Sequence, residues 1–229
     1  MLKFYYNGAP NPLKVGLFLE ESGLPYEAIP VDTRRGQQHE PAFLAINPNG
    51  KVPAIVDGDA VVFDSNAILL YLAEKTGQFL PENTPAARGA LLSWLMFVAS
   101  GVGPFSGQAV HFRHVALGDT AYPRKRYDYE ARRHWRIIDD RLAQGPYMLG
   151  ERYTIVDMAV WGWATRIYYA LGDDALAEFP NVVRLMAEID ARPAGQRALG
   201  LKDRHAFKLE LDDAAMRVMY PQIYAPDPA

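Results

Sequence analysis

One stretch near residue 50 constrains the fold of this chain more than any other. Residues 47–57 read as a loop, a proline that opens a short strand, and the turn Asp57-Gly58-Asp59, which is a good hairpin signal. A second strand is predicted at Val61-Val62, and Ser65 is a favourable cap for the helix that follows. The stretch therefore predicts a β-hairpin that leads into a helix.

The preceding residues predict a β-α-β unit. Residues 2–6 and 26–31 are expected to be strands. Between them, Asn11 is a good N-cap and Pro12 is favoured at the first helical position, so a helix is expected to begin there. The order β-α-β followed by β-β-α is that of a thioredoxin-like half with a mixed four-stranded sheet.

The chain changes character after this half. Glycine and proline residues punctuate a linker, and beyond it strand signals are few and helical patterns are long. The expected fold class is α/β followed by all-α. We expect a thioredoxin-like domain over residues 1–77, a linker over 78–86 and an all-helical domain over 87–229.

Local signals also divide the helical part. Residues 101–104, Gly-Val-Gly-Pro, should kink or break a long apolar helix. Residues 154–157, Thr-Ile-Val-Asp, form a capping-box variant that should fix the start of a core helix over 155–170. The last 30 residues have weak periodicity, and an extended tail is expected over 224–229.

Composition excludes several kinds of function. The chain has no cysteine, so it has no thiol nucleophile or thiolate metal site of its own, and any thiol chemistry must use the sulfur of a ligand. The net charge of -3, without a basic cluster free of acids, argues against a nucleic-acid partner. The sequence contains no run of 18 apolar residues, so no membrane span is expected. The apolar stretch at the N-terminus is too short for a signal peptide. A cytoplasmic location is therefore expected by default.

Residues of the hairpin stretch could together hold a small peptide-like anion. In a thioredoxin-like half, the bond before a proline such as Pro53 is typically cis, which would turn the N–H and C=O of Val52 toward the cleft. Ser65 at a helix N-terminus could bind a carboxylate, Asp64 an ammonium and Lys51 a second carboxylate. The alternatives are a trans edge-strand proline, a simple helix cap and a surface lysine.

These residues together resemble the glutathione transferase family, and the resemblance extends over essentially the whole chain. The hairpin stretch and the capping box at 154–157 are its specific parts. The chain is most similar to the bacterial nu-class branch, disulfide-bond reductases related to the yeast nitrogen regulator of the same fold. The pieces that point to this branch are Pro10-Asn11-Pro12, Phe18-Leu19-Glu20-Glu21, Leu69 to Gly77, and Gly101-Val102-Gly103-Pro104 with Gly107-Gln108.

The resemblance implies a site for glutathione, reduced or oxidised, as co-substrate. By it, Val52 beside Pro53 binds the cysteinyl backbone, Asp64 and Ser65 bind the γ-glutamyl end, and Asn11 faces the sulfur.

Further residues are assigned to the edges of this site. The resemblance implies that Gln38 and Lys51 help to hold the peptide and that Arg133 reaches toward it from the helical domain, although the alignment could slip by one to Arg132. His111 and His114 could share a helix face, but two histidines without a third ligand are a poor metal site, so no metal is expected. The residues expected to line or flank a second-substrate pocket are Phe105, His111, His114 and Arg132.

Asn11 is the residue expected to activate the sulfur. A thiol with a pKa of about 8.5 must lose roughly two units, about 2.7 kcal/mol, to be mostly ionised at neutral pH. A hydrogen bond to a charged group contributes about 1.5–3 kcal/mol, and a helix N-terminus about 0.3–1 kcal/mol. Tyr6 is a second candidate for the sulfur contact, with core packing as its alternative, and Ala9 stands where the nu branch often has a threonine.

The function favoured is that of a homodimeric, glutathione-dependent enzyme. The glutathione thiolate would attack a small disulfide or an organic hydroperoxide, and two glutathione molecules would supply both electrons because the protein has no cysteine. One alternative is conventional conjugation of glutathione to an electrophile. Another, in a different class, is a non-catalytic glutathione-binding or protein-interaction module.

Overall fold

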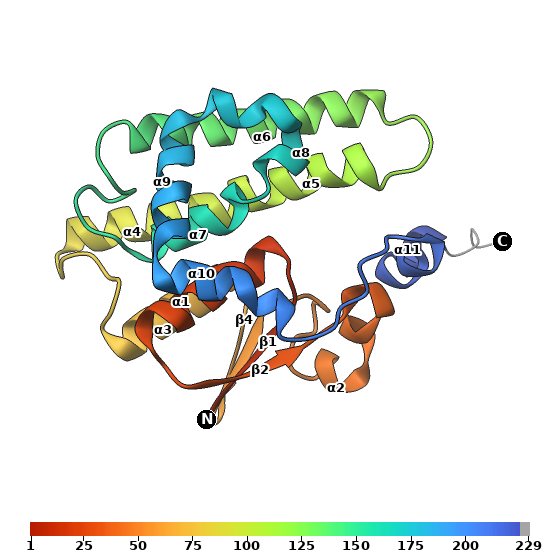
Figure 1. Cartoon of the computed structure of the whole chain (residues 1–229), viewed down its shortest axis with the longest axis horizontal. Coiled ribbons are helices and arrows are strands. Elements are labelled where there is room, and N and C mark those ends of the chain that lie inside the picture. The colour runs from red at the N-terminus through yellow and green to blue at the C-terminus, as the bar shows by residue number, and fades with distance from the viewer. Residues whose placement is uncertain (225–229) are drawn as a thin grey trace.

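The computed structural model describes residues 1–224, which form a four-stranded sheet with flanking helices and a larger group of helices beside it (Figure 1). The strands are β1 (Leu2–Tyr6), β2 (Tyr26–Pro30), β3 (Ala54–Asp57) and β4 (Ala60–Phe63), in the spatial order β2-β1-β3-β4. β1 is parallel to β2, and the pairs β1–β3 and β3–β4 are antiparallel. The mixed thioredoxin-like sheet expected from the sequence is therefore confirmed.

The helices follow the predicted order. Those that accompany the sheet are α1 (Pro10–Ser22), α2 (Pro41–Leu44) and α3 (Ser65–Thr76), with the short 3-10 turns η1 (Thr33–Arg35) and η2 (Gln37–His39). The others are α4 (Pro85–Phe97), η3 (Val98–Val102), α5 (Gly103–His114), α6 (Ala121–Leu142), α7 (Ile155–Ala164), α8 (Ile167–Leu171), η4 (Asp173–Glu178), α9 (Pro180–Ala191), α10 (Pro193–Leu199), η5 (Gly200–Asp203), α11 (Asp213–Met219) and α12 (Pro221–Tyr224).

Helix α1 is the element that joins the two parts of the molecule. It packs against α3 on the sheet side and against α7 and α10 on the other (Figure 1). Leu17 and Phe18 are fully buried in these contacts. At Gly162 of α7 an added Cβ would lie only 2.7 Å from the carbonyl oxygen of Pro10, so the two helices meet backbone to backbone. Only glycine permits that approach.

The expected break at residues 101–104 is a π-helical turn. Residues 98–102 form η3, which connects α4 to α5 without interrupting the helical run Pro85–His114. No membrane span was expected here, yet this run is long and apolar enough, by length and composition alone, to cross a membrane. In the described fold, 39% of its most apolar 18-residue stretch is buried. Leu95 and Val98 are among its fully buried residues in the core.

The capping box was predicted correctly, but the helix that it starts is shorter than expected. Thr154 Oγ1 accepts the N–H of Val156, and the Asp157 carboxylate accepts the N–H of Thr154 at 2.8 Å. The expected helix over 155–170 divides into α7 and α8, because the backbone of Arg166 leaves the helical region at ψ 7°.

The chain after residue 200 is more ordered than its weak periodicity suggested. Its helix α11 packs on η1, where an added Cβ at Gly36 would lie 3.3 Å from Cβ of Val218. The backbone N–H of Lys208 also donates to the Asp32 carboxylate at 2.7 Å. The segment thus returns to the sheet half, while residues 225–229, most of the expected tail, lie outside the described part of the chain.

Replacing Asp157 by alanine should destabilise the fold. The side chain is fully buried and accepts the N–H groups of Met148 at 2.7 Å and Thr154 at 2.8 Å, so its loss leaves both donors unpaired. We expect the free energy of unfolding to fall by about 2–4 kcal/mol. Urea unfolding measures this change, with Asp140→Ala, at an exposed position of α6, as the control. Equal stability of the two variants would contradict the role given to Asp157.

Candidate functional site

Asn11 lies in the first turn of α1, two positions deeper than predicted. The helix begins at Pro10 with Ala9 as its N-cap, so Asn11 is the second helical residue and not the cap. The difference arises because Pro10 suits the first helical position as well as Pro12 does. Neither proline has an N–H, so among these first three helical residues only Asn11 offers a backbone donor.

Side chains from three helices meet at Asn11. Its Oδ1 accepts hydrogen bonds from Trp163 Nε1 at 3.0 Å and from Ser65 Oγ at 3.4 Å. Ser65 Oγ in turn accepts a hydrogen bond from Lys14 Nζ at 3.3 Å. The structure therefore brings together Asn11 and Ser65, which were predicted, with Lys14 and Trp163, which were not.

The start of α3 differs from the prediction by one residue. Asp64, not Ser65, is the N-cap, and its Oδ1 accepts the N–H groups of Asn66 at 2.9 Å and Ala67 at 3.1 Å. Asp64 adopts φ 71°, a backbone conformation that residues other than glycine rarely adopt. Ser65 is only 3% exposed, whereas Asp64 is exposed. Two first-turn donors are thus already satisfied by Oδ1 of Asp64.

The loop before β3 carries the other predicted binding residues. The bond between Val52 and Pro53 is cis, as expected. Gly50, with φ 60°, lies against Gln38, since an added Cβ would be 3.2 Å from the Gln38 carbonyl oxygen. Lys51 is exposed, while Gln38 is 4% exposed and its Oε1 has no hydrogen-bond partner among residues 1–224. The structure thus places the loop that carries Lys51 and Val52 against Gln38.

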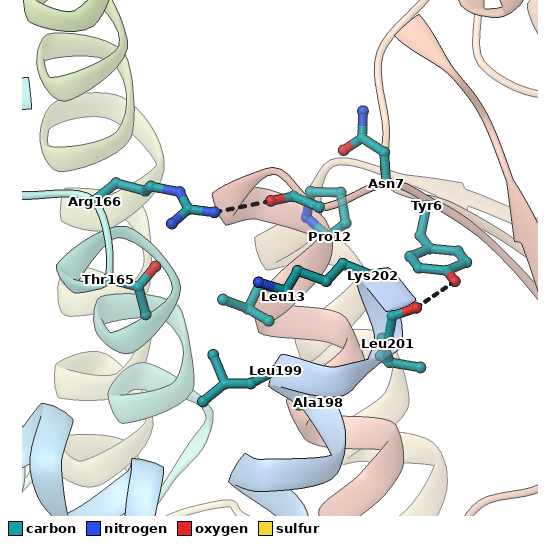
Figure 2. A pocket seen from close by; sticks show the side chains of 11 residues that line it. Tyr6, Asn7, Pro12, Leu13, Thr165, Arg166, Ala198, Leu199, Leu201 and Lys202 are labelled. Carbon is teal, nitrogen blue, oxygen red and sulfur yellow. Dashed lines mark hydrogen bonds between the residues drawn. The ribbon is translucent and has the colours of Figure 1, made fainter. Parts of the chain in front are cut away.

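Tyr6 is not brought to the group around Asn11. Its side chain is 2% exposed, and its hydroxyl donates to the Leu201 carbonyl at 2.8 Å, as Figure 2 shows. The same hydroxyl lies 2.8 Å from His205 Nδ1. Burial raises the pKa of the Tyr6 phenol. These contacts favour packing, the alternative named for Tyr6, over a contact with sulfur.

Arg133 and Phe105 have a common neighbour in the helical part. His134 is buried, its ring centroid lies 4.7 Å from that of Phe105, and its Nε2 lies 3.4 Å from Arg133 Nη2. An added Cβ at Gly101 would lie 2.5 Å from the His134 ring, so the π-helical turn accommodates this histidine. Arg133 is 45% exposed and pairs with Glu130 at 2.9 Å.

The remaining residues predicted for the second-substrate pocket do not lie together. Arg132 pairs with Asp128 at 2.8 Å and with Glu178, and donates to the Leu171 carbonyl at 2.9 Å, so it is tied into the helical bundle. His111 lies edge-on to Tyr220 with ring centroids 5.4 Å apart, and its pKa is lowered by burial.

His114 instead stacks on Tyr169 with ring centroids 4.0 Å apart. His111 and His114 therefore contact different neighbours. No group of three His, Cys, Asp or Glu side chains within residues 1–224 is arranged to hold a metal ion.

A small pocket that the sequence did not indicate lies beside the start of α1. Figure 2 shows Arg166 and Lys202 among its lining side chains, together with Tyr6 and Leu13. Arg166 donates to the Gly8 carbonyl at 3.3 Å, so the strand-to-helix loop is held against the end of α7.

Comparison with known proteins identifies the family. Residues 9–75 match the model of the glutathione S-transferase N-terminal domain, and residues 121–188 match that of the C-terminal domain. The chain is 42% identical over 206 residues to the disulfide-bond oxidoreductase YfcG of Escherichia coli strain K12, covering 87% of this chain and 94% of YfcG. The chain belongs to the glutathione transferase family.

Two solved glutathione transferases have the same fold. One from Pseudomonas fluorescens pf-5, with two glutathione molecules bound, is 38% identical with a TM-score of 0.81, and the match covers 86% of this chain and 92% of that one. One from Pseudomonas putida, with one glutathione disulfide bound per subunit, is 37% identical with a TM-score of 0.81 and covers 87% and 91%. The two-part fold expected from the sequence is thus that of this transferase family.

Lys14 and Trp163 were not predicted from the sequence, and only Lys14 had a signal there. Lys14 is a single charge within the otherwise apolar run of α1 and lies three residues after Asn11, which puts both on one helix face. That spacing was a usable signal. Trp163 is 152 positions from Asn11, and no local pattern connects the two.

Lys14 should make the stability of this transferase depend on pH. Burial lowers the pKa of its ammonium to about 7 from an unfolded value near 10.5. The cost of the buried charge is fully present below pH 7. It disappears as pH rises toward 10.5, because the folded state then loses its proton before the unfolded state does. The free energy of unfolding of the native protein, relative to that of Lys14→Met, should therefore rise between pH 6 and pH 9.

Urea unfolding of both proteins at the two pH values measures this difference. Lys3→Met, at an exposed lysine of β1, is the matched control and should show no such trend. A difference between native protein and Lys14→Met that does not change with pH would show that Lys14 is charged to the same extent in both states.

Proposed function

We propose that this transferase is a glutathione-dependent disulfide reductase in which Asn11 stabilises the thiolate of bound glutathione. The observation that supports this most directly is the contact between Asn11 Oδ1 and Ser65 Oγ at 3.4 Å, which joins the first turn of α1 to that of α3. A γ-glutamyl group at Asp64 and Ser65 would then have its cysteine within reach of Asn11. Val52, Gln38 and Lys51 would hold the rest of the peptide, and Arg133 would approach it from the helical part.

The reaction balances with glutathione as the only reductant. The first thiolate attacks one sulfur of a disulfide, forms a mixed disulfide with glutathione and releases the other sulfur as a thiolate, which takes up a proton. A second glutathione thiolate attacks the glutathione sulfur of the mixed disulfide and releases the second substrate thiol. Two glutathione molecules are oxidised to one glutathione disulfide, and the substrate gains two electrons and two protons.

Related activities use the same activated sulfur. An organic hydroperoxide would be reduced by attack of the thiolate on oxygen, which releases an alcohol, and a second glutathione would then release water. Conjugation to an electrophilic carbon is the conventional alternative. The name of YfcG as a disulfide-bond oxidoreductase favours disulfide reduction. The buried contacts among Asn11, Ser65 and Lys14 argue against a decayed, non-catalytic site. Consumption of reduced glutathione fits a reducing compartment such as the cytoplasm.

A homodimer fits the exposed apolar surface of this chain. Val61 and Phe63 on the edge strand β4 are 49% and 43% exposed, and Met96 on α4 is 47% exposed. A contiguous apolar patch is typical of subunit interfaces, so the dimer proposed here has these three side chains on one shared face. Burial of these residues by a second copy would also cover part of the apolar run Pro85–His114.

Replacing Asn11 by alanine should separate catalysis from binding. The thiolate loses its side-chain donor, so we expect disulfide turnover to fall well over tenfold, in line with about 1.5–3 kcal/mol for a hydrogen bond to a charged group. Glutathione affinity, measured by calorimetry, should change little. Asn83→Ala, in the exposed loop before α4, is the control.

Substrate choice in the same assay tests the reaction type. Turnover of a small hydroxyalkyl disulfide should exceed conjugation to a chloronitroaromatic compound. The reverse order would favour the conjugating alternative, and equal losses of affinity and turnover in Asn11→Ala would make Asn11 a structural residue. Failure to bind either reduced or oxidised glutathione would reject the proposed function altogether.

Replacing Met96 by glutamate should weaken the dimer. A charge in an apolar interface costs desolvation energy that nothing there offsets, so the dissociation constant should rise about tenfold or more. Analytical ultracentrifugation measures it. Leu117→Glu, at a position 70% exposed in the loop after α5, is the matched control and should leave the dimer unchanged. A native protein that sediments as a monomer would reject the dimer itself.

A further inference from the structure

The effect of Asn11 on a thiolate depends on which end of its side-chain amide faces the sulfur. The amide nitrogen carries two N–H donors, whereas the oxygen is only an acceptor. A donor would stabilise a thiolate, and an oxygen in the same place would repel it. The two orientations are related by a rotation about one bond and have nearly the same shape, so a neighbouring group must select one of them.

Trp163 is the group that selects the orientation. Its indole Nε1 is a donor with no acceptor capacity, and it lies 3.0 Å from Asn11 Oδ1. A donor-only group can face only the oxygen of an amide, so the hydrogen-bond network itself decides the orientation. The Asn11 nitrogen is then turned away from Trp163, and the Asn11 side chain is partly exposed.

The indole is itself held by the packing around it. Trp163 is 9% exposed. An added Cβ would lie 3.2 Å from its Nε1 at Gly103 and 3.6 Å from its ring at Gly107, so the indole packs on the glycine face of α5. The neighbouring Gly162 brings α7 against the start of α1. The indole is therefore held closely on the side of α5, where a Cβ at Gly103 would press on Nε1.

We propose that Trp163 is a positioning residue for thiol activation: its indole N–H holds the oxygen of the Asn11 amide and thereby directs the amide nitrogen toward the sulfur of glutathione. This inference rests on the proposed function, because it needs Asn11 to face the sulfur. Trp163 does not touch the sulfur. Through Trp163, the helical part of the protein acts on a thiol that is bound by the sheet half.

The test compares two tryptophans of the same helix. Trp163→Phe removes the donor to Asn11 and keeps an aromatic ring. Trp161→Phe, the matched control, removes a buried indole donor whose partner is Asp190 at 2.7 Å, away from Asn11. The readout is the pKa of the thiol of bound glutathione, followed by the ultraviolet absorbance of the thiolate as pH is varied, together with the pH profile of disulfide turnover.

We expect Trp163→Phe to raise the pKa of the bound thiol by about one unit, which lowers turnover at neutral pH about threefold and restores it at higher pH. Affinity for glutathione should change much less. Trp161→Phe should lower thermal stability without changing the thiol pKa. An unchanged thiol pKa in folded Trp163→Phe would overturn the proposal, and so would an equal rise in both variants.

A double mutant separates this inference from the proposed function. If Trp163 acts through Asn11, then adding Trp163→Phe to Asn11→Ala should not raise the thiol pKa further. A thiol pKa that Asn11→Ala leaves unchanged would reject the proposed role of Asn11. A rise in Asn11→Ala without one in Trp163→Phe would reject only the positioning role.

Gly103→Ala provides the same test without removing the indole. Its Cβ would press on Nε1 and shift it by a few tenths of an ångström. If Trp163→Phe does not fold, this variant decides the question. A raised thiol pKa in Gly103→Ala supports the proposal, and an unchanged value overturns it.

Discussion

The close approach of α1 and α7 is the constraint on which the rest of the site depends. At Gly162 an added Cβ would lie 2.4 Å from Cγ of Lys14 and 2.7 Å from the carbonyl oxygen of Pro10. Any other residue would force the two helices apart. Because they touch, the next residue of α7, Trp163, reaches Asn11 across the boundary between the sheet half and the helical half. The geometry around Asn11 is therefore a consequence of helix packing as much as of the first domain.

The site includes two features that are unfavourable in the free protein. Lys14 is a fully buried ammonium that donates a hydrogen bond to the neutral hydroxyl of Ser65, and burial lowers its pKa to about 7. Asp64 holds a backbone conformation that costs of the order of 1–3 kcal/mol in a residue other than glycine. The Lys14 ammonium and Asp64 meet at the start of α3, where Lys14 Nζ donates to Ser65 Oγ and the Asp64 charge partly offsets the burial of the ammonium. Strain and buried charge of this kind are typical of sites organised for a ligand.

Features with local causes could be predicted from the sequence. The order of elements along the sheet half followed from the hairpin turn at Asp57-Gly58-Asp59 and the β-α-β pattern before it, and the Thr154 capping box from residue types at a fixed spacing. Helix starts were misplaced by one or two residues where two nearby residues fit one role. Pro10 and Pro12 both suit a first helical position, and Asp64 and Ser65 are both good caps, so the surrounding fold made the choice.

Features that depend on tertiary contacts could not be predicted. The break between α7 and α8 falls at Thr165 and Arg166, where no glycine or proline marks it. The burial of the Tyr6 hydroxyl against Leu201 and the contact of Trp163 with Asn11 each join residues more than 150 positions apart. The loop residues of the candidate site could be proposed from the sequence because their chemistry is local, whereas the distant residues that contact them could not.

The segment after residue 200 has a consequence for how the molecule moves. It contacts η1 through Val218 at Gly36 and α5 through Tyr220 at His111, so one length of chain fastens both halves along the same edge. A strap of this kind resists hinge opening at that edge. The two halves should then melt together in a single cooperative step.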